Sequence, residues 1–199
     1  FNSTCTRIIM KFTRLEIPEL ILCESKVLSD ERGYFTEAFR KDKLDSFLGY
    51  SLNFCQDNES KSSFGVLRGL HYQLPPFAQT KLIRVIEGSV LDVAVDVRKG
   101  SPSFGKHVAI ELNSENKKQL LIPKGFAHGF VVLSNTAVFS YKVDNYYNAA
   151  SERGIAFDDS IINVDWRVEK HKLKLSMKDT KQPSLENAEC FKYEMNLNV

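Results

Sequence analysis

The chain has 199 residues, of which 43% are hydrophobic, and this length and composition suit a single domain with a well-formed core. Its 27 basic and 25 acidic residues leave a formal charge of +2, and no dense block of lysines and arginines indicates a nucleic-acid partner. The four cysteines form no CxxC pair, which argues against a zinc site or a disulfide framework. No apolar run approaches the roughly 20 residues of a membrane span, so we expect a cytoplasmic protein.

The first nine residues precede Met10 and show no clear hydrophobic period. We interpret residues 1–9 as a leader or a translation artefact outside the fold, and residues 10–199 as one domain. A strand-like stretch follows over residues 11–27. Residues 41–48 predict a helix, and parts of the tail after His171 also look helical, although Pro183 limits them.

The middle of the chain is dominated by strand patterns. Residues 91–97 alternate strictly between apolar and other side chains, which predicts a strand buried on one face only. Residues 81–86 are also strand-like, and the Glu87-Gly88 turn between the two segments predicts a hairpin. Further strands are predicted at 107–112, 119–122, 129–133 and 137–144. Their number and spacing are typical of a sandwich or barrel.

One strand-like stretch carries the residues best suited to chemistry. Residues 68–73 read RGLHYQ, and Lys81 follows eight residues after the last of them. A histidine can take a proton near neutral pH, and a nearby Lys or Arg can hold the negative charge that this leaves on a carbonyl oxygen. These groups could enolise a ketone. A lone histidine in a strand is, however, more often a hydrogen-bonded structural residue.

The spacing within this stretch makes a geometric prediction. Arg68 and His71 are three residues apart, and in a regular strand they would point to opposite faces. A shared site therefore requires a break in the alternation, and Gly69 is suited to it because glycine inside a strand often marks a bulge. We expect an irregularity at Gly69 or Leu70 and His71 facing the interior.

A second histidine lies in a motif of its own. Residues 123–128, PKGFAH, resemble the second motif of cupins, in which the histidine points into a small jelly-roll barrel. Metal-binding cupins generally carry an HxH pair in the first motif, whereas this chain has His71-Tyr72-Gln73 there. With His128 that gives two histidines, and a stable transition-metal site normally needs a third protein ligand. We therefore expect no metal.

Several short stretches together resemble one family. They occur in the order found in the dTDP-4-dehydrorhamnose 3,5-epimerase family, and the resemblance spans roughly residues 10–183. The stretches are DERGYF at 30–35, QDNES at 56–60, RGLHYQ at 68–73, AQTK at 78–81, residues 123–130, NYY at 145–147 and LSMKD at 175–179. The resemblance implies a mainly β fold, a cupin-like jelly roll or double-stranded β-helix with a few short peripheral helices.

The resemblance also implies an activity. Members of the family are cofactor-independent epimerases that invert C3 and C5 of dTDP-4-dehydro-6-deoxy-D-glucose to give dTDP-4-dehydro-L-rhamnose. By this resemblance His71 is the base and is paired with Asp179, Lys81 lies near the C4 oxygen, and Tyr141 donates a proton on the opposite face. Other positions that match the nucleotide-sugar site are Arg32, Glu37, Gln56, Asn58, Arg68, His128 and Tyr147. The family also implies a homodimer in which an N-terminal strand crosses to the partner, so that Arg32 could serve the neighbouring site.

Each assignment has a simpler alternative. Tyr141 lies in register with Phe139 and Val143, which is also the pattern of an aromatic core residue. Asp179 could be a solvated carboxylate, and His128 could only support the pocket. Asp92 is expected either to pair with Lys81 or to face water.

The chain departs from the family at two positions. Thr80 stands where Gly commonly precedes the lysine, and Arg167 stands where Pro is usual. Three other functions remain open: a C3-only dTDP-sugar epimerase of another deoxysugar pathway, a jelly roll that binds nucleotide-sugars without catalysis, and a metal cupin.

Overall fold

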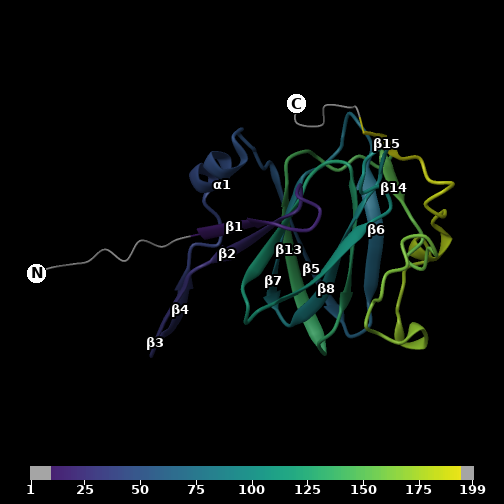
Figure 1. The fold of residues 1–199 in the computed structure, drawn as a ribbon. Helices are drawn as coiled ribbons and strands as arrows, with labels where there is room; N and C mark the ends of the chain where they lie inside the picture. Colours follow the sequence, from purple (N-terminus) through teal and green to yellow (C-terminus); the bar gives the residue numbers. More distant parts are fainter. Residues whose placement is uncertain (1–9, 194–199) are drawn as a thin grey trace, which may run out of the picture.

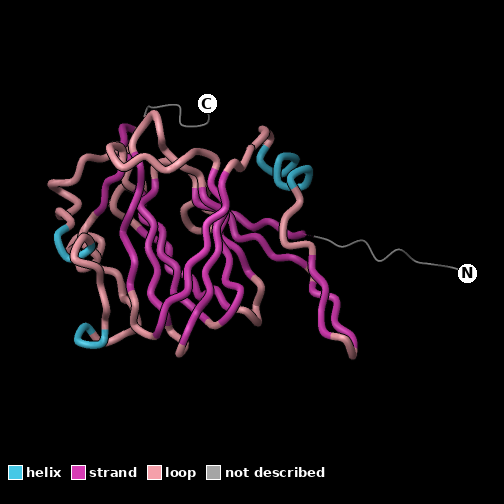
Figure 2. Tube along the Cα trace, turned by 180° about the vertical axis from the view of Figure 1, so that it is seen from behind, coloured by secondary structure: helices cyan, strands magenta, loops and turns pink. Residues whose placement is uncertain are grey.

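Two antiparallel sheets form the body of the protein and face one another as a jelly roll (Figures 1 and 2). The computed structural model describes residues 10–193, so the proposed leader at 1–9 lies outside the described residues. The six-stranded sheet has the order β1 (Met10–Arg14), β2 (Ile21–Ser25), β11 (Lys118–Ile122), β7 (Lys81–Glu87), β13 (Thr136–Val143) and β5 (Gln56–Ser63). The five-stranded sheet has the order β10 (His107–Asn113), β8 (Ser89–Asp96), β12 (Phe126–Val132), β6 (Leu67–Gln73) and β14 (Glu152–Gly154). The predicted mainly β jelly roll is confirmed.

Smaller elements lie around the two sheets. The predicted helix is confirmed as α1 (Lys41–Leu48), and the tail contains two short 3₁₀ helices, Lys170–Lys172 and Asp179–Lys181. Two short strand pairs complete the described chain, namely β3 (Val27–Asp30) with β4 (Gly33–Thr36), and β9 (Arg98–Lys99) with β15 (Phe191–Lys192). No helix in residues 10–193 is long and apolar enough to cross a membrane.

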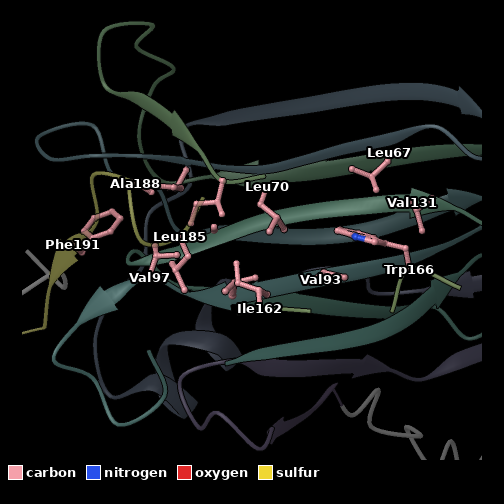
Figure 3. Packing of buried hydrophobic residues seen from close by; sticks show 14 of the residues in the cluster. Leu67, Leu70, Val93, Val97, Val131, Ile162, Trp166, Leu185, Ala188 and Phe191 are labelled. Atoms are coloured by element: carbon pink, nitrogen blue, oxygen red, sulfur yellow. The ribbon is translucent and has the colours of Figure 1, made fainter. Parts of the chain in front are cut away.

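Three apolar layers hold these elements together. The layer between the two sheets includes Ile83, Ala94 and Phe139. A second layer lies on the outer face of the five-stranded sheet, where the C-terminal segment brings residues such as Trp166 and Phe191 against it (Figure 3). A third, smaller layer joins α1 to the outer face of the six-stranded sheet. Burial of apolar area is the main favourable term in each layer.

The structure corrects the prediction for residues 91–97. The strand is buried on both faces, because the alternate positions Asp92, Ala94 and Asp96 are each 0% exposed. Their side chains point to the layer between the sheets, and the two carboxylates are bonded there to His128 and Arg98 instead of to water. The alternation of polar residues in this strand therefore reflects buried hydrogen-bonded carboxylates and not a face exposed to solvent.

The hairpin predicted across Glu87-Gly88 is also wrong. Strand β7 pairs with β11 and β13, whereas β8 pairs with β10 and β12 in the opposite sheet. Gly88 has a φ of +77°, and a Cβ there would lie 2.1 Å from the carbonyl oxygen of Thr136. The turn is therefore pressed against the start of β13, and it carries the chain between sheets.

One element stands away from the body. The hairpin of β3 and β4 extends beyond the edge of the sheets (Figures 1 and 2). Its large apolar side chains are exposed, with Tyr34 and Phe35 each at 59%. Strand β1, in contrast, pairs with β2 of the same chain over all five of its residues.

Candidate active site

A cavity of about 640 Å³ opens between the two sheets and holds most of the predicted site residues. It is lined from both sheets and from the segment that leads to Asp179. The lining side chains include Asn58, Arg68, His71, Lys81, His128, Phe130, Phe139, Tyr141, Lys174, Ser176, Lys178 and Asp179. A second cavity, of about 720 Å³, lies near residues 16–19, 101–107 and Tyr193 and contains none of the predicted site residues.

The alternation of β6 breaks at Gly69, as predicted. His71 lies opposite His128 and Arg68 lies opposite Phe130, so β6 uses one more residue than β12 over the same span. Gly69 has a φ of +132°, and a Cβ there would lie 2.5 Å from Gly129 Cα. Only glycine fits this close approach.

The extra residue brings two polar side chains to the same face. Leu67 and Leu70 both pack in the outer apolar layer, while Arg68 and His71 both line the cavity. The bulge therefore places a cation and a titratable base in one site, which a regular strand could not do.

His71 is paired with a buried carboxylate. Its Nε2 atom lies 2.5 Å from Asp179 Oδ1, and the His71 side chain is 28% exposed whereas that of Asp179 is 4% exposed. Ser176 holds the other carboxylate oxygen by donating from Oγ to Oδ2 over 2.9 Å. Burial acts to raise the pKa of Asp179, but the hydrogen bonds from His71 and Ser176 outweigh it and the net pKa is lowered. Asp179 thus stays ionised and can stabilise an imidazolium.

Lys81 places a cation in the same cavity from the opposite sheet. It begins β7 and lies on the interior face that also carries Ile83. Burial lowers the pKa of Lys81 to about 8, although the charges of Asp92 and Glu152 oppose this fall. Lys81 is half-buried, and this partial loss of hydration strengthens its interaction with a developing negative charge.

The position of Tyr141 is compatible with both alternatives that the sequence left open. Its ring lies 6.0 Å from that of Phe139 and packs against the interior layer, as the core alternative predicted. It also lines the cavity. Burial raises the pKa of Tyr141 while the charge of Arg68 acts to lower it. The phenol is therefore protonated at neutral pH, as a proton donor must be.

His128 is bonded to an aspartate beneath the cavity. Its Nε2 atom lies 2.9 Å from Asp92 Oδ2, and the two side chains are 8% and 0% exposed. Burial lowers the pKa of His128, although Asp92 opposes the shift. The expectation for Asp92 is corrected, because its hydrogen bond goes to His128 and not to Lys81 or to solvent.

Four predicted residues do not line this cavity. Arg32 is at the tip of the β3–β4 hairpin and bonds to Asp30, and the side chain of Glu37 pairs with Arg40 at 3.3 Å. Gln56 donates from Nε2 to Asn58 Oδ1 over 2.8 Å, and Asn58 in turn lines the cavity. Tyr147 is 57% exposed and donates from its hydroxyl to Glu152 over 2.7 Å.

Sequence reasoning missed one ion pair at the site. Glu152, on the edge strand β14, pairs with Lys178, which lines the cavity. Lys178 lies inside the LSMKD stretch, so its motif could have identified it. Glu152 is in no such motif, and only the pairing of β14 with β6 brings it near.

The two departures from the family pattern have different consequences. Thr80 keeps a negative φ, and its backbone N–H donates to Asp144 Oδ1 over 2.6 Å, so no glycine is required before Lys81. Arg167 has a φ of +56°, a conformation closed to proline. The local backbone at Arg167 therefore excludes the residue usual at that position.

Comparisons with known proteins agree with the geometry. A family model described as dTDP-4-dehydrorhamnose 3,5-epimerase matches residues 14–187. The dTDP-4-dehydrorhamnose 3,5-epimerase of Shigella flexneri is 53% identical over 160 residues, covering 80% of this chain and 88% of that protein. The Pseudomonas aeruginosa enzyme of the same name is 47% identical over 182 residues, covering 92% and 99%.

Solved structures give the same result. The dTDP-6-deoxy-D-glucose-3,5-epimerase of Legionella pneumophila, solved with dTDP-4-keto-L-rhamnose, matches with a TM-score of 0.90 and 44% identity over 94% of this chain and 100% of that chain. A 3′-monoepimerase of Streptomyces bikiniensis, solved with dTDP-quinovose, matches at 0.81 and 31% identity over 86% of each chain. These matches, which agree with the fold and the cavity, show that the chain belongs to the dTDP-4-dehydrorhamnose 3,5-epimerase family.

Proposed function

We propose that this cavity inverts C3 and C5 of dTDP-4-dehydro-6-deoxy-D-glucose and releases dTDP-4-dehydro-L-rhamnose, without a cofactor. The observation that carries the proposal is the His71–Asp179 pair, which shares one cavity with Lys81 and Tyr141. Dehydrorhamnose 3,5-epimerase activity follows from the family, and the roles of the individual residues are the proposal.

The reaction needs a base, a cation and an acid. The C4 ketone acidifies the protons on C3 and C5, so His71 can remove one of them and become an imidazolium paired with Asp179. The electron pair of the broken C–H bond moves to the C4 oxygen, where the Lys81 ammonium stabilises the enolate. Tyr141 then donates its proton to the opposite face of the carbon. Proton return from solvent to Tyr141, and from His71 to solvent, restores both groups for the second carbon.

The charges around the cavity suit a nucleotide diphosphate. Arg68 and Lys178 line the cavity, and Arg68 offers a planar fork that binds phosphate oxygens in pairs. Because the Legionella relative was solved with a dTDP-sugar, we infer that this chain binds the same class of ligand. Asn58 and its partner Gln56 could then contact the nucleoside.

We further propose a homodimer in which the β3–β4 hairpin reaches the partner. The hairpin stands away from its own body and exposes Tyr34 and Phe35 (Figure 1). Because β1 pairs within its own chain, this hairpin is the N-terminal element best placed to cross. It would carry Arg32 into the neighbouring site.

Mixed dimers test this arrangement. We expect Arg32→Ala and His71→Asn each to be nearly inactive alone. After the two variants are mixed and allowed to exchange subunits, one site in each mixed dimer would combine an intact His71 with an intact Arg32, and activity should return. No recovery after verified exchange would place Arg32 in its own site. Near-normal activity of Arg32→Ala alone would place it outside catalysis.

Incubation with dTDP-4-dehydro-6-deoxy-D-glucose in deuterated water tests the reaction itself. We expect NMR to show deuterium at both C3 and C5 and inversion of both carbons. Deuterium at C3 alone would favour the C3-only alternative, which the match to a 3′-monoepimerase keeps open. Binding without exchange at either carbon would indicate a non-catalytic module.

A further inference from the structure

Asp92 is a fully buried carboxylate that the proposed reaction does not use. It lies on β8 with 0% of its surface exposed, and it points into the layer between the sheets. It does not line the cavity, although its partner His128 does. One of its oxygens, Oδ1, has no hydrogen-bond partner among the described residues. Leaving a carboxylate oxygen buried and unbonded is costly, so such a group calls for an explanation.

Asp96, four residues along the same strand, shows how a structural carboxylate is held. It is equally buried, yet Arg98 donates to both of its oxygens, and Ser101 and Ser103 donate to Oδ2. Its charge is compensated locally. Within residues 10–193, Asp92 is hydrogen-bonded only to His128, so its charge is compensated much less than that of Asp96.

The negative charge of Asp92 therefore acts on the charged groups that line the cavity. Asp92 and His128 come from the five-stranded sheet, while Lys81 begins β7 in the opposite sheet, and His128 and Lys81 line the same cavity. Asp92 is the leading charge that holds up the pKa of Lys81 against burial, followed by Glu152. The other titratable side chains that line the cavity are Glu59, Arg68, His71, Tyr141, Lys174, Lys178 and Asp179. In a water-poor interior such charge–charge interactions are strong.

We propose that Asp92 is a positioning residue for the epimerase reaction: its carboxylate keeps Lys81 protonated and fixes His128 in the tautomer that carries its proton on Nε2. The His128 Nε2–H donates to Asp92 Oδ2, which leaves Nδ1 with a free lone pair and the ring uncharged. A neutral His128 adds no further positive charge beside Lys81. This inference rests on the proposed role of Lys81 in stabilising the enolate.

The protonation of Lys81 can be measured without any substrate. Protein labelled with ¹³C-lysine is titrated by NMR, and the Lys81 Cε resonance is identified by its loss in Lys81→Met. We expect Asp92→Asn to lower the Lys81 midpoint by about one pH unit, the smallest shift usual for loss of a nearby opposite charge. The matched control is Asp96→Asn, which removes an equally buried carboxylate of the same strand and should leave this midpoint unchanged.

Turnover gives a second reading that a purely structural role would not change. The fall of kcat at high pH should begin at lower pH in Asp92→Asn, shifted by the same amount as the titration midpoint of Lys81. KM should change little. Turnover of the variant should therefore recover relative to wild type as the pH is lowered. Asp96→Asn is expected to lower the melting temperature without moving the pH at which kcat falls.

The outcomes separate this inference from the proposed function. An unchanged Lys81 midpoint in folded Asp92→Asn would overturn the inference and leave the base and acid roles intact. A lowered midpoint with unchanged kcat at every pH would instead remove Lys81 from the reaction. If Asp92→Asn does not fold, ¹⁵N NMR of the four histidines in the wild-type protein tests the inference through the tautomer and charge of His128. An Nδ1–H tautomer or an imidazolium at His128 at pH 7 would then overturn the inference.

Discussion

The Nε2 atom of His71 lies 2.5 Å from Oδ1 of Asp179, although the two residues are separated by 108 positions in the chain. His71 reaches the cavity because β6 bulges at Gly69. Asp179 follows a segment that pairs with the start of β6, where the Leu67 N–H donates to the Lys174 carbonyl oxygen. The pair is thus assembled by two independent parts of the fold.

The first prediction concerns this pair. We expect His71→Asn to lower kcat by about 10²- to 10⁴-fold, the loss usual when a general base is removed, with a much smaller effect on substrate affinity. Asp179→Asn should lower kcat by a smaller factor, because it leaves the base in place and removes only the charge that stabilises the imidazolium. Steady-state kinetics and binding of dTDP measure the two effects. Near-normal turnover of His71→Asn would exclude His71 as the base.

Tyr141 provides a test that separates deprotonation from inversion. In Tyr141→Phe the base and the cation remain, so the C–H proton should still exchange with deuterated solvent. Inverted product should fall by about 10²-fold or more, because the donor on the opposite face is missing. NMR follows both in one sample. Equal losses of exchange and inversion would contradict a separate acid role, and Phe139→Leu serves as a packing control.

The half-buried Lys81 should make stability depend on pH. Its pKa is about 8 in the folded protein against an ordinary 10.5, so between these values the unfolded chain binds the extra proton. Stability contributed by this site therefore rises with pH across that window. We expect Lys81→Met to raise the free energy of unfolding at pH 7 by about 1–3 kcal/mol, and the gain to shrink towards pH 10.5.

Urea unfolding at several pH values measures this gain, with the exposed Lys11→Met as the control. A gain that is the same at pH 7 and pH 10.5 would show that Lys81 titrates normally in the folded protein. Turnover of Lys81→Met should be largely lost at every pH.

Gly69→Ala should disrupt the bulge. The new Cβ would meet Gly129 Cα at 2.5 Å and the His128 carbonyl oxygen at 2.8 Å, and the backbone has an unfavourable φ as well. We expect a loss of several kcal/mol in stability and loss of activity. Gly49→Ala is the matched control, because Gly49 also has a positive φ but a Cβ there meets nothing within 4 Å. A similar melting temperature for both variants would show that β6 and β12 can separate without cost.

Activity should survive removal of metal ions. Among the described residues 10–193, no group of three or more His, Cys, Asp or Glu side chains is arranged to hold a metal ion. We expect unchanged kcat after chelation and dialysis, checked by elemental analysis of the same sample. A stoichiometric metal whose loss abolishes turnover would favour the metal-cupin alternative.

The local pattern of the chain was enough to predict many elements. Strand β10 and helix α1 lie within one residue of their predicted bounds. Hydrophobic periodicity and the residues that begin or end an element are local properties of the sequence. Gly69 could be named as the site of a break because Arg68 and His71 have a spacing that a regular strand cannot place on one face. The resemblance in short motifs then indicated the family and most of the cavity residues.

Other features were decided only by tertiary structure. Strands β7 and β8 belong to opposite sheets, and Asp92 and Asp96 are buried, because long-range pairing determines which polar residues find partners away from water. The same holds for Glu152, whose link to the site depends on β14 pairing with β6. The sequence by itself determined the strand-rich pattern, the break at Gly69 and the chemistry of the motifs. The structure decided which charges are buried together, since electrostatic coupling depends on distance and solvation in space rather than on separation along the chain.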